Sequence, residues 1–183
     1  MEYQSKATLR SCTSVTGITF MPNIHTSGST YAAPGPTSGY EWLPYTNAHY
    51  LATVKSAIKW IDEHVKNYNP CQTVFKALPD GRSFKAVWTD ASIWISYCAV
   101  NTIGSYGATL EERHITVCRY ALLKGLKVTA ATIVHELAHC NGAGSDDNKA
   151  EATLKKCLLK SQFHDDIIGE LNRQRQLRPA VLA

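Results

Sequence analysis

The 183-residue chain lacks several features that would point to a function at once. No apolar run approaches the roughly 18 residues of a membrane-spanning helix, so a transmembrane segment is not expected. No block of lysine and arginine exceeds two residues and the net charge is only +4, so nucleic acid is not expected as a partner. The chain has no glycine-rich phosphate loop and no Gly-x-Ser-x-Gly sequence, which leaves nucleotide-dependent and serine-hydrolase chemistry unsupported.

The N-terminus and the cysteines also lack familiar signatures. The first twenty residues do not show the charged and then apolar segments of a cleavable signal peptide. No Cys-x-x-Cys pair is present, so a zinc ribbon or a thioredoxin-type site is not expected. Two interpretations stay open for the cysteines: small buried hydrophobic side chains, or one to three disulfides formed in an oxidising compartment. The six are Cys12, Cys71, Cys98, Cys118, Cys140 and Cys157.

What the sequence does contain is enough for one folded domain over residues 1–183. Hydrophobic residues make up 44% of the chain, and at this length roughly 70% of the unfolded surface can be buried. Residues 1–45 show no stable period, and the stretch 26–44 is crowded with Ser, Thr, Gly and Pro. We therefore expect an irregular N-terminal segment that either lies over the domain or is partly mobile.

A single apolar stripe predicts a helix over residues 47–68. Its apolar side chains recur at intervals of three and four residues, as they do on one face of a helix. Thr46 or Asn47 can cap its start, and Asn69-Pro70 would end it. The stripe consists of Leu51, Val54, Ile58, Ile61, Val65 and Tyr68. We expect this helix to be scaffold.

The following region predicts a small, mostly antiparallel sheet. Residues 73–78 and 83–88 are expected to form a hairpin around the turn Pro79-Asp80-Gly81. Residues 93–97 and 114–118 are short alternating runs that predict two more strands.

Helices are expected to follow, which makes the fold class α+β. Residues 129–140 predict a helix with Thr129 as its N-cap and Gly142 just past its end. Two more helices are expected over 149–160 and 162–173.

Residues 135–139 read His-Glu-Leu-Ala-His, the HExxH pattern, for which the chance expectation in a chain of this composition is roughly 0.01. Positions four apart lie on one helix face, so the imidazoles of His135 and His139 can hold one Zn²⁺. Glu136 would lie beside the metal without binding it, as a general base does. The alternative is an amphipathic helix whose polar face meets water.

This segment resembles the zincin metallopeptidases. The sequence VHELAH, followed by NGAG and by an Ala-Glu pair on the next predicted helix, is also similar to small bacterial metallopeptidase domains found in secreted or contact-delivered toxins. The resemblance covers residues 128–157 and implies a zincin-like fold, a zinc cofactor and peptidase activity, but no particular substrate. A metzincin site is not expected, because its third histidine would fall at Ser145.

A catalytic zinc usually has three protein ligands and one open position. Gluzincins use a glutamate on a following helix, which favours Glu151, although this residue could instead form a capping box with Asn148. Aspzincins supply an aspartate from the loop after HExxH, which makes Asp147, or its neighbour Asp146, the alternative, although either can cap the helix. His164 is a further candidate.

In the expected mechanism, zinc lowers the pKa of a water and polarises the substrate carbonyl, while Glu136 moves the proton of that water to the leaving amine. The oxyanion needs a further donor, for which Tyr106 and His114 are candidates; they could equally be a loop aromatic and a solvent-facing histidine. Zincins pair extended substrate with an edge strand beside the active-site helix, and residues 114–118 are the expected edge.

The cysteine after the second histidine suggests a further hypothesis. The side chain of Cys140 leaves the helix about 100° away from His139, so we do not expect it to bind zinc. A disulfide between Cys140 and Cys157 would fix Glu151 relative to the HExxH helix.

The sequence is thus interpreted as a zinc metallopeptidase, a bacterial toxin or effector that acts outside the cytoplasm of its producer without a cleavable signal peptide. Its partners would be a protein or peptide substrate, together with an immunity protein or a secretion carrier. Two alternatives stay open. One is a zinc-dependent peptidoglycan amidase or endopeptidase, because the same chemistry cleaves any amide. The other is a binding module that keeps a zincin scaffold without turnover.

Overall fold

The structure of the protein is a computed structural model that describes residues 21–145 and 148–158. Within these residues the fold is α+β, as predicted, with six helices and a small four-stranded sheet. In chain order the elements are β1 (Asn23–Ile24), α1 (Ala48–His64), α2 (Asn69–Lys76), α3 (Phe84–Trp88), β2 (Trp94–Cys98), β3 (Gly107–Leu110), β4 (His114–Cys118), α4 (Arg119–Leu123), α5 (Leu126–His139) and α6 (Lys149–Leu158).

The sheet is mixed, so the prediction of mostly antiparallel strands was wrong. Its strand order is β1-β2-β4-β3, with parallel pairing of β1 to β2 and of β2 to β4. Only the hairpin between β3 and β4 is antiparallel. Because β3 folds back outside β4, residues 114–118 lie in the interior of the sheet and β3 forms the edge. The expectation that 114–118 would be the edge strand was therefore also wrong.

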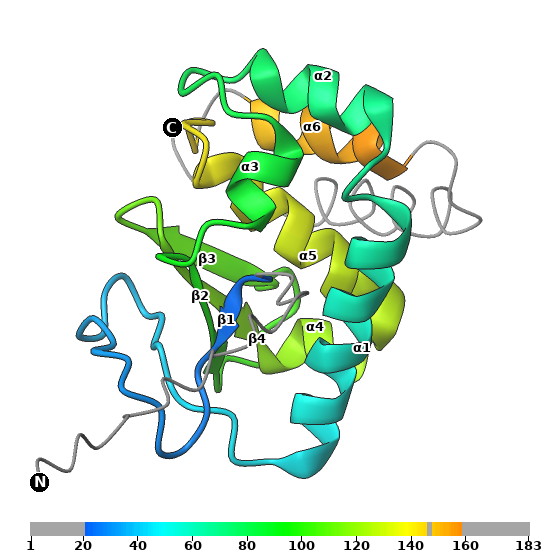
Figure 1. The fold of residues 1–183 in the computed structure, drawn as a ribbon. Helices are drawn as coiled ribbons and strands as arrows, with labels where there is room; N and C mark the ends of the chain where they lie inside the picture. Colours follow the sequence, from blue (N-terminus) through cyan, green and yellow to red (C-terminus); the bar gives the residue numbers. More distant parts are fainter. Residues whose placement is uncertain (1–20, 146–147, 159–183) are drawn as a thin grey trace, which may run out of the picture.

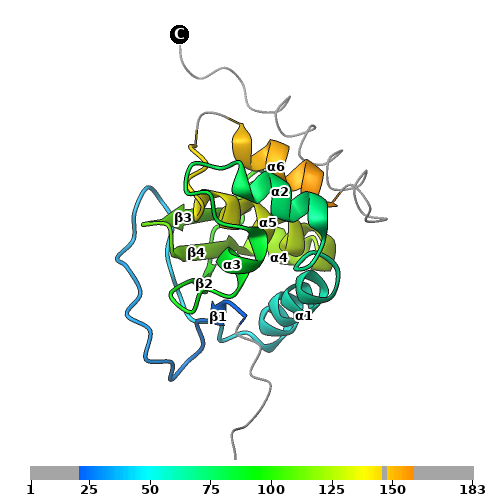
Figure 2. The same ribbon diagram turned by 45° about the horizontal axis from the view of Figure 1, so that its top comes forward.

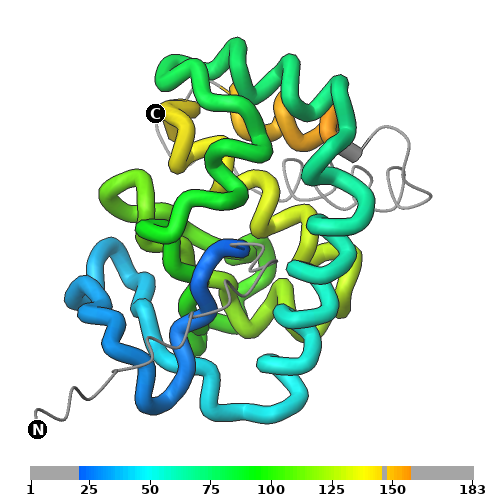
Figure 3. Tube along the Cα trace, in the orientation of Figure 1, coloured from blue at the N-terminus to red at the C-terminus, as the bar shows by residue number. Residues whose placement is uncertain are grey.

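The molecule has three layers, with the sheet in the middle (Figures 1 and 2). Helices α5 and α4 pack on one face of the sheet, and α1 and α6 flank α5. The N-terminal segment runs over the other face, as the tube trace shows (Figure 3). There the indole of Trp42 donates to the main-chain oxygen of His114 (3.1 Å). The hydroxyl of Thr116 donates to the main-chain oxygen of Glu41 (2.8 Å). Residues 26–44 thus lie over the domain, one of the two arrangements expected.

Helix α1 confirms the predicted apolar stripe. The side chain of Asn47 caps it by accepting from the backbone amides of His49 (2.9 Å) and Tyr50 (3.1 Å). Val54 and Ile61 are among the residues that the stripe buries against the core.

The predicted hairpin over 73–78 and 83–88 was wrong, because both segments contribute to helices instead. Pro70 stands in the first turn of α2, where its missing amide costs nothing, so it begins a helix. Helix α1 already ends at His64, so the prediction of a helix over 47–68 that Asn69-Pro70 would end was wrong at its C-terminal end. Ser83 caps α3 by accepting from the amide of Ala86 (3.2 Å). The apolar residues lie at helical spacing and are fully buried: Cys71 and Phe75 in α2, and Phe84, Val87 and Trp88 in α3.

Helix α5 is the central element of the fold, and most of its residues are buried. It begins at Leu126 rather than at 129, so the prediction of Thr129 as N-cap was wrong. Thr129 lies inside the helix and donates to the main-chain oxygen of Ala121 (3.3 Å). Gly142 follows the helix with φ +83°, the left-handed conformation expected of a terminating glycine. Helix α6 falls within the predicted 149–160, and the helix expected over 162–173 lies outside the described residues.

One disulfide is present among the described residues, and it joins Cys71 to Cys157. The hypothesis of a Cys140–Cys157 disulfide was wrong, because α6 lies against α2 as well as α5 and its Cys157 bonds to α2. Both interpretations of the cysteines therefore apply in part. Cys98, Cys118 and Cys140 are free and buried. No helix in the described part of the chain is long and apolar enough to cross a membrane.

Candidate active site

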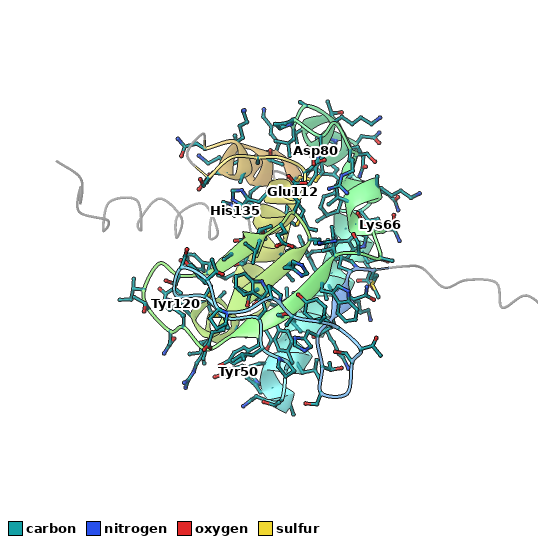
Figure 4. The ribbon with its side chains drawn as sticks, turned by 90° about the vertical axis from the view of Figure 1, so that its left-hand side faces the viewer. Tyr50, Lys66, Asp80, Glu112, Tyr120 and His135 are labelled. Atoms are coloured by element: carbon teal, nitrogen blue, oxygen red, sulfur yellow. A yellow bond between two sulfur atoms is a disulfide. The ribbon has the colours of Figure 1, made fainter. Side chains whose placement is uncertain are left out.

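The HExxH residues lie in the last two turns of α5. Their two imidazoles and one carboxylate lie between the sheet and the surface. His135 and His139 are half-buried, and Glu136 is only 4% exposed. Figure 4 labels His135 on α5, beside the sheet. Since α5 packs against α1, α4 and α6 and against strands β3 and β4, these three residues are held on a rigid element.

The two histidines turn their rings toward each other. The Nε2 atoms of His135 and His139 lie 3.1 Å apart, and the ring centroids are separated by 4.9 Å. Two nitrogens bound tetrahedrally to one zinc at about 2.0–2.1 Å would lie about 3.3 Å apart. The pair therefore fits one zinc ion within a few tenths of an ångström. Without a metal, the same contact is a hydrogen bond in which one Nε2 must carry the proton.

The other ring nitrogen of His139 is held by the turn that follows the helix. His139 Nδ1 lies 2.7 Å from the main-chain oxygen of Ala143. A carbonyl only accepts, so Nδ1 carries the proton and the lone pair of the neutral ring stands on Nε2. This is how metal-binding histidines are commonly oriented. The left-handed Gly142 makes the contact possible by turning the chain back under the helix, and a side chain there would also meet Asp80 Oδ1 at 2.8 Å.

The turn is anchored by the fully buried Asn141. Its amide donates to the main-chain oxygens of Phe75 (2.7 Å) and Arg82 (2.9 Å), and its oxygen accepts from the backbone amide of Arg82 (3.2 Å). The guanidinium of Arg82 donates to the main-chain oxygen of Cys140 and to Asp90 Oδ2, the latter at 2.9 Å. The loop between α2 and α3 thus fixes the end of the HExxH helix.

Strand β3 covers the carboxylate of Glu136. The hydroxyl of Thr109 donates to Glu136 Oε2 over 2.8 Å. Gly107, two residues earlier on the same face, brings its backbone so close that a Cβ would lie 2.9 Å from Glu136 Oε1. The edge strand and the glutamate of the HExxH pattern are therefore in direct contact.

Cys140 is neutral in this setting. Burial and the nearby charge of Glu136 raise the pKa of its thiol well above the ordinary value.

The third ligand expected from the sequence was Glu151, with Asp147, Asp146 and His164 as alternatives. Within residues 21–145 and 148–158, no group of three His, Cys, Asp or Glu side chains has the arrangement of a metal site. Glu151 is half-buried in the first turn of α6, a helix that packs against α5. Asp146, Asp147 and His164 lie outside the described residues.

The two oxyanion candidates occupy different places. His114 points to the sheet face opposite α5, where its Nδ1 lies 2.7 Å from the hydroxyl of Tyr31, so the structure does not bring it together with His135 and His139. Burial lowers its pKa, and Arg113 adds to this effect. Tyr106 directly precedes β3, with its ring edge-on to Tyr120.

Four residues that shape the site were missed in the sequence: Arg82, Gly107, Thr109 and Asn141. Gly107 and Thr109 belong to a strand that reads as a glycine-containing loop. Their hairpin turns at Glu111 and Glu112, which both adopt positive φ without being Gly or Asn, so the usual turn signal is absent. Asn141 could have been suspected, since a polar residue between a buried helix and its terminating glycine needs buried partners.

No family model, curated protein or solved structure matches the chain. The resemblance to zincins therefore depends on residues 128–157 alone. The geometry around His135, Glu136 and His139 must carry any functional conclusion.

Proposed function

We propose that this protein is a zinc-dependent metallopeptidase. The observation that carries the proposal is the 3.1 Å separation of the His135 and His139 Nε2 atoms, one helical turn apart on the helix that also carries the buried Glu136. The hydrogen bond from His139 Nδ1 to Ala143 supports it, because it directs the lone pair on Nε2 toward the same point as His135.

Glu151 is our proposed third ligand, with Asp147 as the alternative. In favour of Glu151, α6 packs along α5 and the disulfide between Cys71 and Cys157 ties α6 to α2. These contacts hold the first turn of α6 to the domain that carries the histidines. A carboxylate and two imidazoles are a donor set that zinc accepts in hydrolytic sites.

When bound, the zinc ion would supply a Lewis acid and a water of lowered pKa. The chain's own residues do the rest. Glu136, held against β3, takes the proton from the water and delivers it to the leaving amine. Since β3 ends the sheet, its outer backbone edge can pair with an extended peptide and present the scissile bond to the glutamate.

We also propose that the protein acts outside a reducing cytoplasm, as a secreted or delivered toxin or effector. The disulfide between Cys71 and Cys157 supports this, because disulfides persist chiefly in oxidising compartments.

The decisive activity test compares the wild type with Glu136→Gln. Each is incubated with an unfolded protein and, separately, with purified cell wall, and new amino termini are counted. We expect cleavage of the unfolded protein, a loss of roughly 10²–10⁴-fold in Glu136→Gln, and no loss in the matched exposed variant Glu63→Gln. A zinc-loaded wild type that cleaves neither substrate would refute the peptidase, and cleavage of cell wall alone would reassign it as an amidase.

A further inference from the structure

The general base is held by the edge strand through a single hydroxyl. Thr109 Oγ1 lies 2.8 Å from Glu136 Oε2 and 3.1 Å from the main-chain oxygen of the same residue. A threonine hydroxyl has one proton to donate, and the shorter distance to the charged oxygen makes Glu136 Oε2 its acceptor.

The second carboxylate oxygen rests on Gly107. A Cβ at this position would lie 2.9 Å from Glu136 Oε1, 2.8 Å from Thr132 Cγ2 and 2.8 Å from the main-chain oxygen of Thr116. The last contact is with the backbone of the neighbouring strand, which cannot move aside. Positions 107 and 109 point to the same face of β3, so glycine provides the space and threonine the donor for one carboxylate.

The contacts of Glu136 with Thr109 and Gly107 matter because a glutamate side chain has several rotatable bonds and could adopt other orientations. Because only 4% of the residue is exposed, its carboxylate is oriented mainly by the contacts with β3 rather than by bulk water. A general base must lie within hydrogen-bond reach of the proton that it removes, and a misplacement of about 1 Å can cost roughly 100-fold in rate.

We propose that Thr109 is a positioning residue for Glu136, and that Gly107 provides the gap in which its carboxylate rests. The inference depends on the proposed peptidase function for its kinetic consequence, but not for its structural one. Thr109 touches neither the substrate nor the metal in this role, and it acts by restricting Glu136 to one orientation.

The test uses the zinc-loaded protein with Thr109→Val, which removes the hydroxyl but keeps the shape and strand preference, and with Thr109→Ser, which keeps the hydroxyl. We expect kcat to fall about 10- to 100-fold in Thr109→Val with KM within about twofold, and Thr109→Ser to recover kcat to within about threefold. Zinc content should equal that of the wild type in both variants. Thr73→Val, which removes an exposed hydroxyl bonded to a helix backbone, is the control and should leave kcat unchanged.

Crystal structures of the two Thr109 variants separate this inference from the proposed function. A Glu136 carboxylate that leaves β3 in Thr109→Val and returns in Thr109→Ser supports the positioning role, even if the wild type cleaves no peptide. A carboxylate that stays in place, or a serine variant as impaired as the valine variant, would overturn it. Should Thr109→Val not fold, Thr109→Ala is compared with Thr109→Ser in the same way.

Discussion

Replacing Asn141 by alanine should destabilise the fold by between about 2 and 5 kcal/mol. The side chain is fully buried and satisfies the main-chain oxygens of Phe75 and Arg82 and the backbone amide of Arg82. Each buried group that loses its partner costs about 1–3 kcal/mol, and because the three are neighbours their costs do not add fully. For a domain of this size, 1 kcal/mol corresponds to about 2–4 °C in Tm.

Urea denaturation with EDTA present measures this cost without any contribution from bound metal. The matched control is Asn101→Ala, at an exposed loop position, which should stay within about 0.5 kcal/mol of the wild type. The slope of the transition should be the same in all three proteins, since the surface exposed on unfolding is the same. A destabilisation below about 1 kcal/mol in Asn141→Ala would refute the view that this residue anchors the end of the HExxH helix.

Three other changes should have distinct effects. Gly107→Ala should lower kcat at least 10-fold and reduce thermal stability, because the added Cβ would lie against the backbone of β4 and the carboxylate of Glu136. An unchanged kcat and Tm would show that the site has room for a Cβ. Cys71→Ser with Cys157→Ser should lower the free energy of unfolding by about 2–5 kcal/mol. Chain-entropy arithmetic for a separation of 86 residues gives roughly 4–5 kcal/mol, the upper part of this range, and equal urea midpoints would contradict the prediction. Burial raises the pKa of Asp90, but hydrogen bonds from its serine neighbour and the charge of Arg82 outweigh this and hold the pKa below its usual value. Its stabilisation is therefore present above about pH 4 and lost as the pH falls through the lowered pKa, so Asp90→Asn should show a weaker loss of stability between pH 5 and pH 3 than the wild type.

The sequence predicts the parts of this fold that depend on local pattern. The apolar stripe of α1 and its Asn47 cap follow from spacing and side-chain chemistry, as does the glycine that ends α5. The two helices α2 and α3 show where such reasoning fails. Their β-branched and aromatic residues favour strands, and only the buried positions, which repeat at helical spacing, show that tertiary packing overrode that preference.

The sequence predicts the site residues that lie together in one helix, but not the residues that other elements bring to the site. His135, Glu136 and His139 are recognised by spacing within one helix, whereas Thr109 reaches Glu136 from a strand 27 positions earlier in the sequence. The edge position of β3 depends on strand order, which no local pattern specifies. The disulfide partner of Cys157 likewise depended on how α6 lies against α2, which spacing alone could not reveal.

The central claim is that the imidazoles of His135 and His139 bind one zinc ion. Metal analysis of protein purified without chelators tests it most directly, with Glu136→Gln, His139→Ala, Glu151→Ala and Asp147→Ala measured in parallel. We predict about one zinc per chain in the wild type and in Glu136→Gln, a loss in His139→Ala, and a loss in Glu151→Ala but not in Asp147→Ala. A wild type that binds no zinc even after incubation with the metal would contradict the account.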